Sequence, residues 1–196
     1  MIEDLMNLRN STCEITTTVV DGMCAMPTHH NSLKVLKFVN SATSDKKEMR
    51  EFLEGVLFQD TYAVATDGRR LHIYLGEEFN ISKFGAARVS VSKNDTVCKF
   101  YDCHFPNFRR VIPEITDATS KVLLSYYKNN GICDFIYPLS KNKFVFNDLY
   151  LKELVTYADV WRAYFSENTS AVVFESLDTT LPKVYAVIMP IKVSDA

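Results

Sequence analysis

The stretch "YAVATDGRRLHIYLG", residues 62–76, predicts two antiparallel strands joined by a tight turn. Apolar residues flank Asp67 and Gly68, the dipeptide that best supplies the positive φ angles of a two-residue hairpin turn. Two adjacent arginines, Arg69 and Arg70, follow the turn. Because successive strand residues point to opposite faces, we expect one arginine to face solvent and the other to lie against another part of the protein. Asp67 precedes a turn glycine, so its expected role is structural rather than catalytic.

The composition is that of an ordinary globular protein, with 47% hydrophobic and 23% charged residues in a chain of 196. This length is enough to bury a sizeable core. The net charge of −2 provides no overall attraction to nucleic acid. The five cysteines show no CxxC spacing, which indicates reduced thiols. The start of the chain lacks the pattern of a signal peptide, and no apolar run is long enough to cross a membrane, so we expect a cytoplasmic protein without membrane contact.

The pattern along the chain predicts the same order of elements at both ends. At the amino-terminal end a strand is expected at 13–20, a helix at 33–43 capped by Asn31 or Ser32, and strands at 52–59, 61–66 and 70–76. The middle of the chain carries strand signals at 87–92, 97–102, 121–127 and 133–139. The carboxyl-terminal third is expected to contain a strand at 143–147, a helix at 149–162 capped by Asn147 or Asp148, and strands at 163–167, 170–176 and 183–193.

This repetition predicts an α+β fold made of two strand–helix–three-strand units with antiparallel sheets. We expect residues 1–196 to form a single compact domain, because no linker separates the two units. Within it, the first helical unit spans about 12–80, the middle strands and a link span 81–138, and the second helical unit spans about 139–196.

Three parts of the sequence, taken together and in order, resemble the bacterial DNA sliding clamp family, the β subunit of DNA polymerase III. Residues 52–71, "FLEGVLFQDTYAVATDGRRL", are similar to a strand and turn of the clamp's middle domain, and residues 105–113, "FPNFRRVIP", to the link between its middle and last domains. Residues 144–155, "FVFNDLYLKELV", and 185–193, "YAVIMPIKV", resemble its last helix and last strand. Nothing in residues 1–30 matches. A clamp chain has three domains, so the resemblance implies a shortened, DNA-clamp-like fold.

The resemblance also implies a peptide-binding groove, because clamps bind short motifs of polymerases, clamp loaders and repair proteins between their last two domains. Carried over position by position, the groove would be lined by Leu53, Thr66, Gly68, Arg69, Arg70, Leu71, Pro106, Arg110, Val111, Asn147, Tyr150, Ala171, Val187, Met189, Pro190, Ile191 and Lys192. Arg69 replaces a frequent histidine of the family and Ile191 a frequent methionine, so the groove would differ in shape. The alternative for Arg69 and Arg70 is one solvated arginine and one whose stem packs on the sheet edge.

Clamp helices face DNA, so the resemblance implies double-stranded DNA as a further partner. It also implies that copies of the chain could assemble into a homo-oligomeric ring. The DNA-facing candidates are Lys34 and Lys37 on the first helix and Lys152 on the second. Phosphate binding grows with the number of cations presented, and the second helix also carries acidic residues. A solvated helix face is therefore an equal alternative.

No pattern in the sequence supports an enzyme, a cofactor or a metal. The histidines and cysteines that could be grouped, at positions 24, 29, 30, 103 and 104, lack ligand spacing. The chain also has no glycine-rich phosphate loop and no nucleophile motif.

The leading hypothesis is a non-enzymatic clamp-like protein of DNA replication or repair that binds clamp-binding peptides, including a processivity factor that closes a ring by oligomerising. The alternative is a clamp-derived interaction module or decoy that binds clamp partners without encircling DNA. A third hypothesis is a clamp-derived scaffold in which the groove is unused.

Overall fold

The computed structural model describes residues 2–13, 15, 22–25, 30–44, 50–76, 79, 85–91, 96–129, 131–140, 144–166 and 170–191. The helices are α1 (Ile2–Asn10), α2 (His30–Ser41), α3 (Gly131–Ser140) and α4 (Asp148–Tyr157), with 3₁₀ turns η1 (Glu51–Glu54) and η2 (Phe108–Val111). The strands are β1 (Gly22–Ala25), β2 (Val56–Gln59), β3 (Tyr62–Thr66), β4 (Arg70–Leu75), β5 (Gly85–Val91), β6 (Thr96–Phe100), β7 (Ser120–Ser125), β8 (Val160–Phe165), β9 (Val172–Ser176) and β10 (Val184–Ile188).

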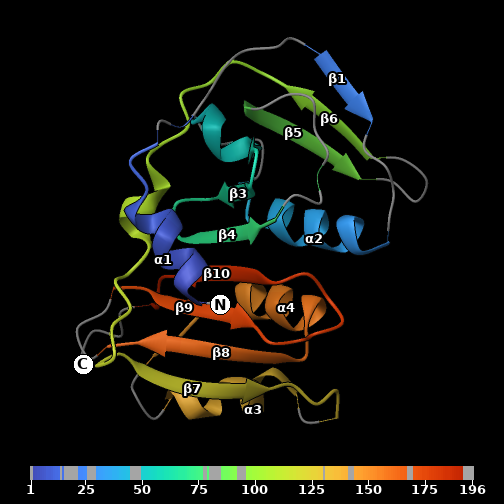
Figure 1. The fold of residues 1–196 in the computed structure, drawn as a ribbon. Helices are drawn as coiled ribbons and strands as arrows, with labels where there is room; N and C mark the ends of the chain where they lie inside the picture. Colours follow the sequence, from blue (N-terminus) through green and yellow to red (C-terminus); the bar gives the residue numbers. More distant parts are fainter. Residues whose placement is uncertain are drawn as a thin grey trace.

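These strands form one ten-stranded sheet in the order β1-β6-β5-β2-β3-β4-β10-β9-β8-β7, and each named pairing is antiparallel. The predicted α+β class is confirmed: in each half a helix precedes three strands, α2 before β2–β4 and α4 before β8–β10. The halves join where the last strand of each pairs side by side, with Leu71 of β4 opposite Val187 of β10 (Figure 1). The two units therefore share a single sheet.

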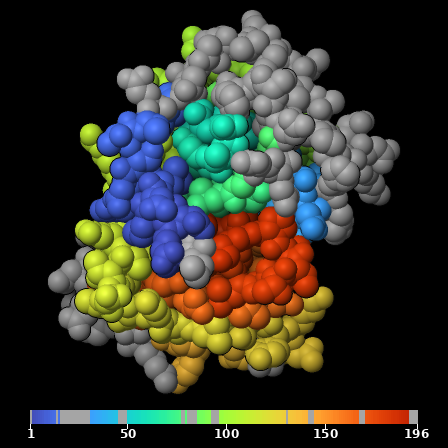
Figure 2. Space-filling view, in the orientation of Figure 1, coloured from blue at the N-terminus to red at the C-terminus, as the bar shows by residue number. Residues whose placement is uncertain are grey.

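Each face of the sheet has its own layer. On one face α2 and α4 pack on the sheet, and they also contact each other. On the other face lie α1 and the link around η2, which contact each other as well; Figure 2 shows α1 in blue beside the yellow-green link. Strand alternation divides β4 between the faces: Leu71 and Ile73 belong to the α1 side, and Tyr74 belongs to the helix pair.

Several sequence predictions about secondary structure were wrong. The strand expected at 133–139 is helix α3, because Phe135 and Leu139, four residues apart, are both fully buried, and a short apolar run conceals this helical period. The helix expected to reach Arg162 ends at Tyr157, where Ala158 adopts an extended backbone (φ −144°, ψ 152°). Trp161 and Arg162 consequently belong to β8.

The two ends of the units also differ from expectation. α2 begins at His30, so the proposed caps Asn31 and Ser32 lie inside its first turn, and β1 forms in a segment where no strand was expected. The strand expected at 143–147 is reduced to a single bridge between Val145 and Ile191. The strand expected at 13–20 falls almost wholly outside the described residues. Helix α1 was not predicted; it buries Leu5 and Leu8 against the sheet.

His72 of β4 is fully buried beneath α2, on the face that carries the helix pair. Its ring stacks on Phe38 with centroids 4.2 Å apart, and its Nδ1 lies 2.8 Å from the Phe38 carbonyl oxygen. Burial lowers the pKa of His72 to about 3, with the Phe38 carbonyl opposing the shift and the nearby Arg70 charge reinforcing it. The imidazole is therefore neutral in the folded protein at neutral pH.

We expect acid to destabilise the fold through His72. As the pH falls below the unfolded pKa of about 6.5, the unfolded chain binds a proton that the folded chain binds only near pH 3. The free energy of unfolding should fall by up to about 1.4 kcal/mol per pH unit over that interval. Urea unfolding at pH 7 and pH 4.5 should show a smaller difference for His72→Phe than for the natural chain. The exposed His104→Phe is the control, and equal pH dependence in all three proteins would contradict this expectation.

Candidate functional site

The hairpin turn between β3 and β4 is held by its own side chains. Thr66 pairs with Leu71, so four residues, not the predicted two, separate these paired positions. Asp67 Oδ1 accepts hydrogen bonds from the backbone N–H groups of Arg69 (2.8 Å) and Arg70 (3.0 Å). Gly68 has φ +89°, which only glycine adopts without strain. Asp67 therefore has the structural role that was predicted, because its carboxylate accepts hydrogen bonds from the Arg69 and Arg70 N–H groups in the turn.

The two arginines diverge as alternation requires, with Arg69 exposed and Arg70 buried. The Arg70 guanidinium bonds to Glu153 of α4, lies 3.1 Å from Asp67 Oδ2 and donates to the Ser41 carbonyl at the end of α2 (2.6 Å). It also lies 4.3 Å from the centroid of the Tyr150 ring. Arg70 thus joins the turn to both helices: its two terminal nitrogens form hydrogen bonds with Glu153 and Ser41, and its Nε lies beside the Asp67 carboxylate without forming a hydrogen bond.

Glu153 is the acidic partner in this contact. Burial raises its pKa, and the Arg70 charge and hydrogen bond oppose the rise. The neutral His72 lies on the same side, with its Nε2 3.9 Å from Glu153 Oε2. Arg70 and Glu153 form a partly buried ion pair that connects β4 to α4, which is the geometry of a structural support.

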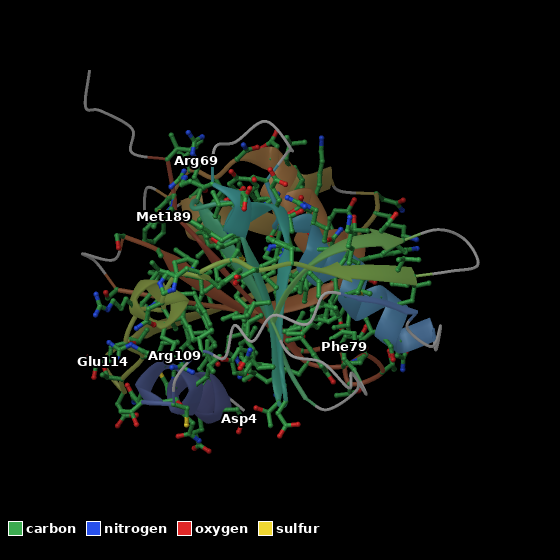
Figure 3. The ribbon with its side chains drawn as sticks, turned by 90° about the horizontal axis from the view of Figure 1, so that it is seen from above. Asp4, Arg69, Phe79, Arg109, Glu114 and Met189 are labelled. Carbon is green, nitrogen blue, oxygen red and sulfur yellow. The ribbon has the colours of Figure 1, made fainter. Side chains whose placement is uncertain are left out.

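A hollow of about 210 Å³, which we call the corner groove, lies beside this turn on the α1 face of the sheet. Three separate segments form it: the turn with η1, the link, and the end of β10. Figure 3 shows Arg69 and Met189 near each other at its rim. The lining residues are Arg50, Phe52, Leu53, Thr66, Gly68, Arg69, Arg70, Leu71, Pro106, Asn107, Phe108, Val111, Val187 and Met189.

Among the described residues predicted for the groove, ten line it and six do not. Arg110 is exposed, and Ala171 is buried beneath the sheet surface with only 2% exposure. Asn147 caps α4 by accepting a hydrogen bond from Leu149 N (2.9 Å), as predicted for the helix start. Tyr150 lies behind Arg70 on the helix side. Pro190 and Ile191 follow Met189 beyond the groove, and Lys192 lies outside the described residues.

Four lining residues were missed by the sequence analysis: Arg50, Phe52, Asn107 and Phe108. Asn107 and Phe108 belong to the quoted link, residues 105–113, but the resemblance assigned the groove contact in this segment to Arg110. The Phe52 ring packs edge-on against Phe105, with centroids 6.4 Å apart. The aromatic residues Phe105 and Phe108, on either side of Pro106, were the feature of the sequence that could have indicated an apolar groove wall in this link.

The link that forms one wall is anchored from behind by the chain around α1. Arg109, only 7% exposed, donates to the carbonyl oxygens of Ser11 (3.2 Å) and Cys13 (2.6 Å). Arg9 at the end of α1 donates to the Ile112 carbonyl (3.0 Å). Phe108, next to Arg109, lines the groove. The amino-terminal residues for which the sequence indicated no role therefore hold the groove wall in place.

A second hollow, of about 400 Å³, lies on the opposite face between α2 and α4; we call it the helix cavity. All three DNA-facing candidates, Lys34, Lys37 and Lys152, line it. Its remaining lining residues are Phe38, Ser41, Arg70, Leu149, Tyr150, Glu153, Thr156 and Tyr157. Arg70 lines both hollows and separates them.

The chemistry available in the corner groove is that of binding. Its walls are mainly aliphatic and aromatic, with arginines at the rim, which is the composition that anchors a short apolar peptide. Among the described residues, no group of three or more His, Cys, Asp and Glu side chains could hold a metal ion. In the same part of the chain no helix has the length and apolar character needed to span a membrane.

Comparison with known proteins identifies the fold. No protein-family model and no curated protein sequence matches the chain. Among solved structures, the Helicobacter pylori β clamp in complex with diflunisal matches with a TM-score of 0.59 and 12% identity, covering 91% of this chain and 68% of the clamp. The same clamp bound to a DNA ligase peptide gives 0.58 and 12%, with 91% and 68% covered. The Pseudomonas aeruginosa DNA polymerase sliding clamp with a ligand gives 0.58 and 14%, with 94% and 69% covered.

These likenesses confirm the predicted DNA-clamp-like fold. The chain has the fold of a bacterial sliding clamp shortened to about two thirds, since it covers 68% of the Helicobacter pylori chain. At these identities the likeness establishes the fold alone.

Removing the acidic partner of Arg70 should destabilise the protein. In Glu153→Gln the Arg70 guanidinium, whose side chain is only 9% exposed, loses one of its two carboxylate partners and keeps Asp67. We expect the free energy of unfolding to fall by about 2 kcal/mol in urea denaturation at pH 7. Asp159→Asn, an exposed carboxylate that follows the same helix, should change it by less than about 0.5 kcal/mol. Equal effects of the two substitutions would refute the importance of this ion pair.

Proposed function

We propose that this chain is a non-enzymatic, clamp-like binding protein whose corner groove takes a short apolar peptide from a protein of DNA replication or repair. The observation that carries this proposal is the convergence of three distant segments, the 66–71 turn, the 106–111 link and the end of β10, on one apolar hollow with an arginine rim. A solved relative in fold, the Helicobacter pylori clamp, is bound to a DNA ligase peptide. That complex supports a peptide as the ligand class.

The size of the groove sets the expected affinity. A hollow of about 210 Å³ accommodates one or two large apolar side chains of a peptide. Each such side chain contributes roughly 1.5–3 kcal/mol on burial. Apolar burial therefore supplies at most about 6 kcal/mol before the cost of ordering the peptide, so micromolar affinity, about −8 kcal/mol, also requires hydrogen bonds between the peptide and the groove. Met189 is 40% exposed and unbranched, so it can adapt to different side chains.

The groove is tested with a fluorescein-labelled synthetic DNA ligase peptide that carries a clamp-binding motif. Met189→Ala removes an exposed wall and should weaken binding about tenfold in fluorescence anisotropy, a loss of about 1.4 kcal/mol. Leu123→Ala removes a comparably exposed apolar side chain on β7 and should leave binding unchanged. Both side chains are at least 40% exposed, so both variants should fold. Binding that is insensitive to Met189→Ala would reject the groove as the site.

A ring-forming processivity factor is the second candidate function, and the sheet provides the observation for it. Within the described residues β1 and β7 end the sheet, and each pairs with a single strand. Open strand edges can pair with another copy of the chain. A chain that covers 68% of a clamp would need a different number of copies from a clamp to close a ring. The competing function is a module or decoy that binds clamp partners as a monomer.

Mass in solution separates these two functions. Light scattering of the purified chain should give about 22.4 kDa for a module, and a multiple of that mass for a ring. A ring should also be retained on circular primed DNA and released when the DNA is linearised. We expect a monomer. Because few cations are available for phosphate contacts, we also expect that the chain is not retained on circular DNA. A trimer or hexamer that stays on circular DNA would establish the processivity role instead.

A further inference from the structure

The helix cavity carries an excess of positive charge. None of the ammonium groups of Lys34, Lys37 and Lys152 has a carboxylate within 4 Å among the described residues. The acid in the lining, Glu153, is already bonded to Arg70. Lys34 extends over the Tyr157 ring, with its Nζ 5.5 Å from the centroid. The cavity is thus an apolar hollow with three lysines at its rim. Lys34 interacts electrostatically with Asp178, whose pKa is lowered mainly by its hydrogen bonds with Thr180 and also by this charge, whereas Lys37 and Lys152 have no carboxylate within 4 Å in the described part of the chain.

The corner groove and the helix cavity share Arg70, and exposed apolar side chains occur at both hollows. Met189, 40% exposed, lines the groove, and Leu149, 62% exposed, lines the cavity. In the segments next to them in the chain, Ile191 and Val145 are 53% and 43% exposed and form a bridge in which Ile191 N donates to the Val145 carbonyl (2.7 Å). Large apolar side chains left in water at both hollows indicate a surface that another molecule covers.

The chemistry of the cavity favours a peptide over duplex DNA. Duplex binding depends on many phosphate contacts. Three lysines provide few such contacts, and the exposed Asp148 lies on the same helix as Lys152. A phosphate backbone would also leave Leu149 and the apolar walls unused. A peptide with acidic side chains and one large apolar side chain matches the lysines and the cavity together.

We infer that the peptide bound in the corner groove continues over Met189, Ile191 and Leu149 and docks an acidic stretch with a large apolar residue in the helix cavity. The inference rests on the proposed function of the groove. It assigns Lys34, Lys37 and Lys152 to peptide carboxylates rather than to DNA phosphates. Arg70, with its internal partners, is the fixed wall between the two anchor points.

The test uses four labelled synthetic peptides with the full-length chain: the DNA ligase motif alone, the motif extended by Asp-Asp-Phe-Glu-Asp at its amino-terminal end, the motif extended in the same way at its carboxyl-terminal end, and the extension alone. At low salt, one of the two extended peptides should bind about tenfold more tightly than the motif. The gain should disappear in Lys37→Ala/Lys152→Ala and shrink at 0.3 M salt, because exposed charge pairs are screened. Lys121→Ala/Lys128→Ala, two exposed lysines outside the cavity, is the matched control and should keep the gain.

Leu149→Ser separates the apolar contribution from the charges. It should reduce the gain of the extended peptide and leave the affinity of the motif alone unchanged. No gain from either extension, or a gain that the two double-lysine variants share, would overturn the inference while leaving the groove intact. Failure of the motif itself to bind would instead reject the proposed function. A labelled 20-base-pair duplex is the last arm: binding that Lys37→Ala/Lys152→Ala abolishes, with no peptide gain, would assign the lysines to DNA.

Discussion

Arg70 is buried where the hairpin turn meets both helices, and its guanidinium has partners on all of them: Asp67 in the turn, Ser41 at the end of α2 and Glu153 on α4. A buried guanidinium is tolerated only when its donors are matched, so this one residue fixes three elements relative to each other. It also begins the strand that pairs with β10, where the two halves of the sheet join. The positions of the corner groove and the helix cavity both follow from this contact.

The groove depends equally on support from the opposite side. The link that forms its outer wall has little regular structure of its own, and its conformation is set by Arg109 and Arg9, which bond to backbone carbonyls across the α1 junction. Leu5 and Leu8 attach α1 to the sheet. The irregular link that forms the groove wall is thus held rigidly by these bonds. Because the wall is already ordered, binding a peptide costs less conformational entropy.

Much of the candidate site could be predicted from local sequence. The turn residues, the Asn147 cap and the apolar strands of the first hairpin are specified by neighbouring residues, and a resemblance carried over by position located most of the groove lining. The errors have a common cause. The short apolar run around Phe135 and Leu139 is compatible with a strand or a helix, and only its packing against β7 decides for the helix. Trp161 belongs to β8 because it pairs with Leu124 of β7 in the sheet.

The sequence by itself determined the alternation that places Arg69 and Arg70 on opposite faces, because the two-residue period of a strand is a property of the backbone. It also determined the antiparallel hairpins and the order of helix and strands in each half. Only the tertiary structure decided what Arg70 contacts. Its partners Ser41 and Glu153 lie 29 and 83 positions away in the chain, and no local rule links residues at such separations. Packing of α2 and α4 on one sheet brings them together and so creates the helix cavity.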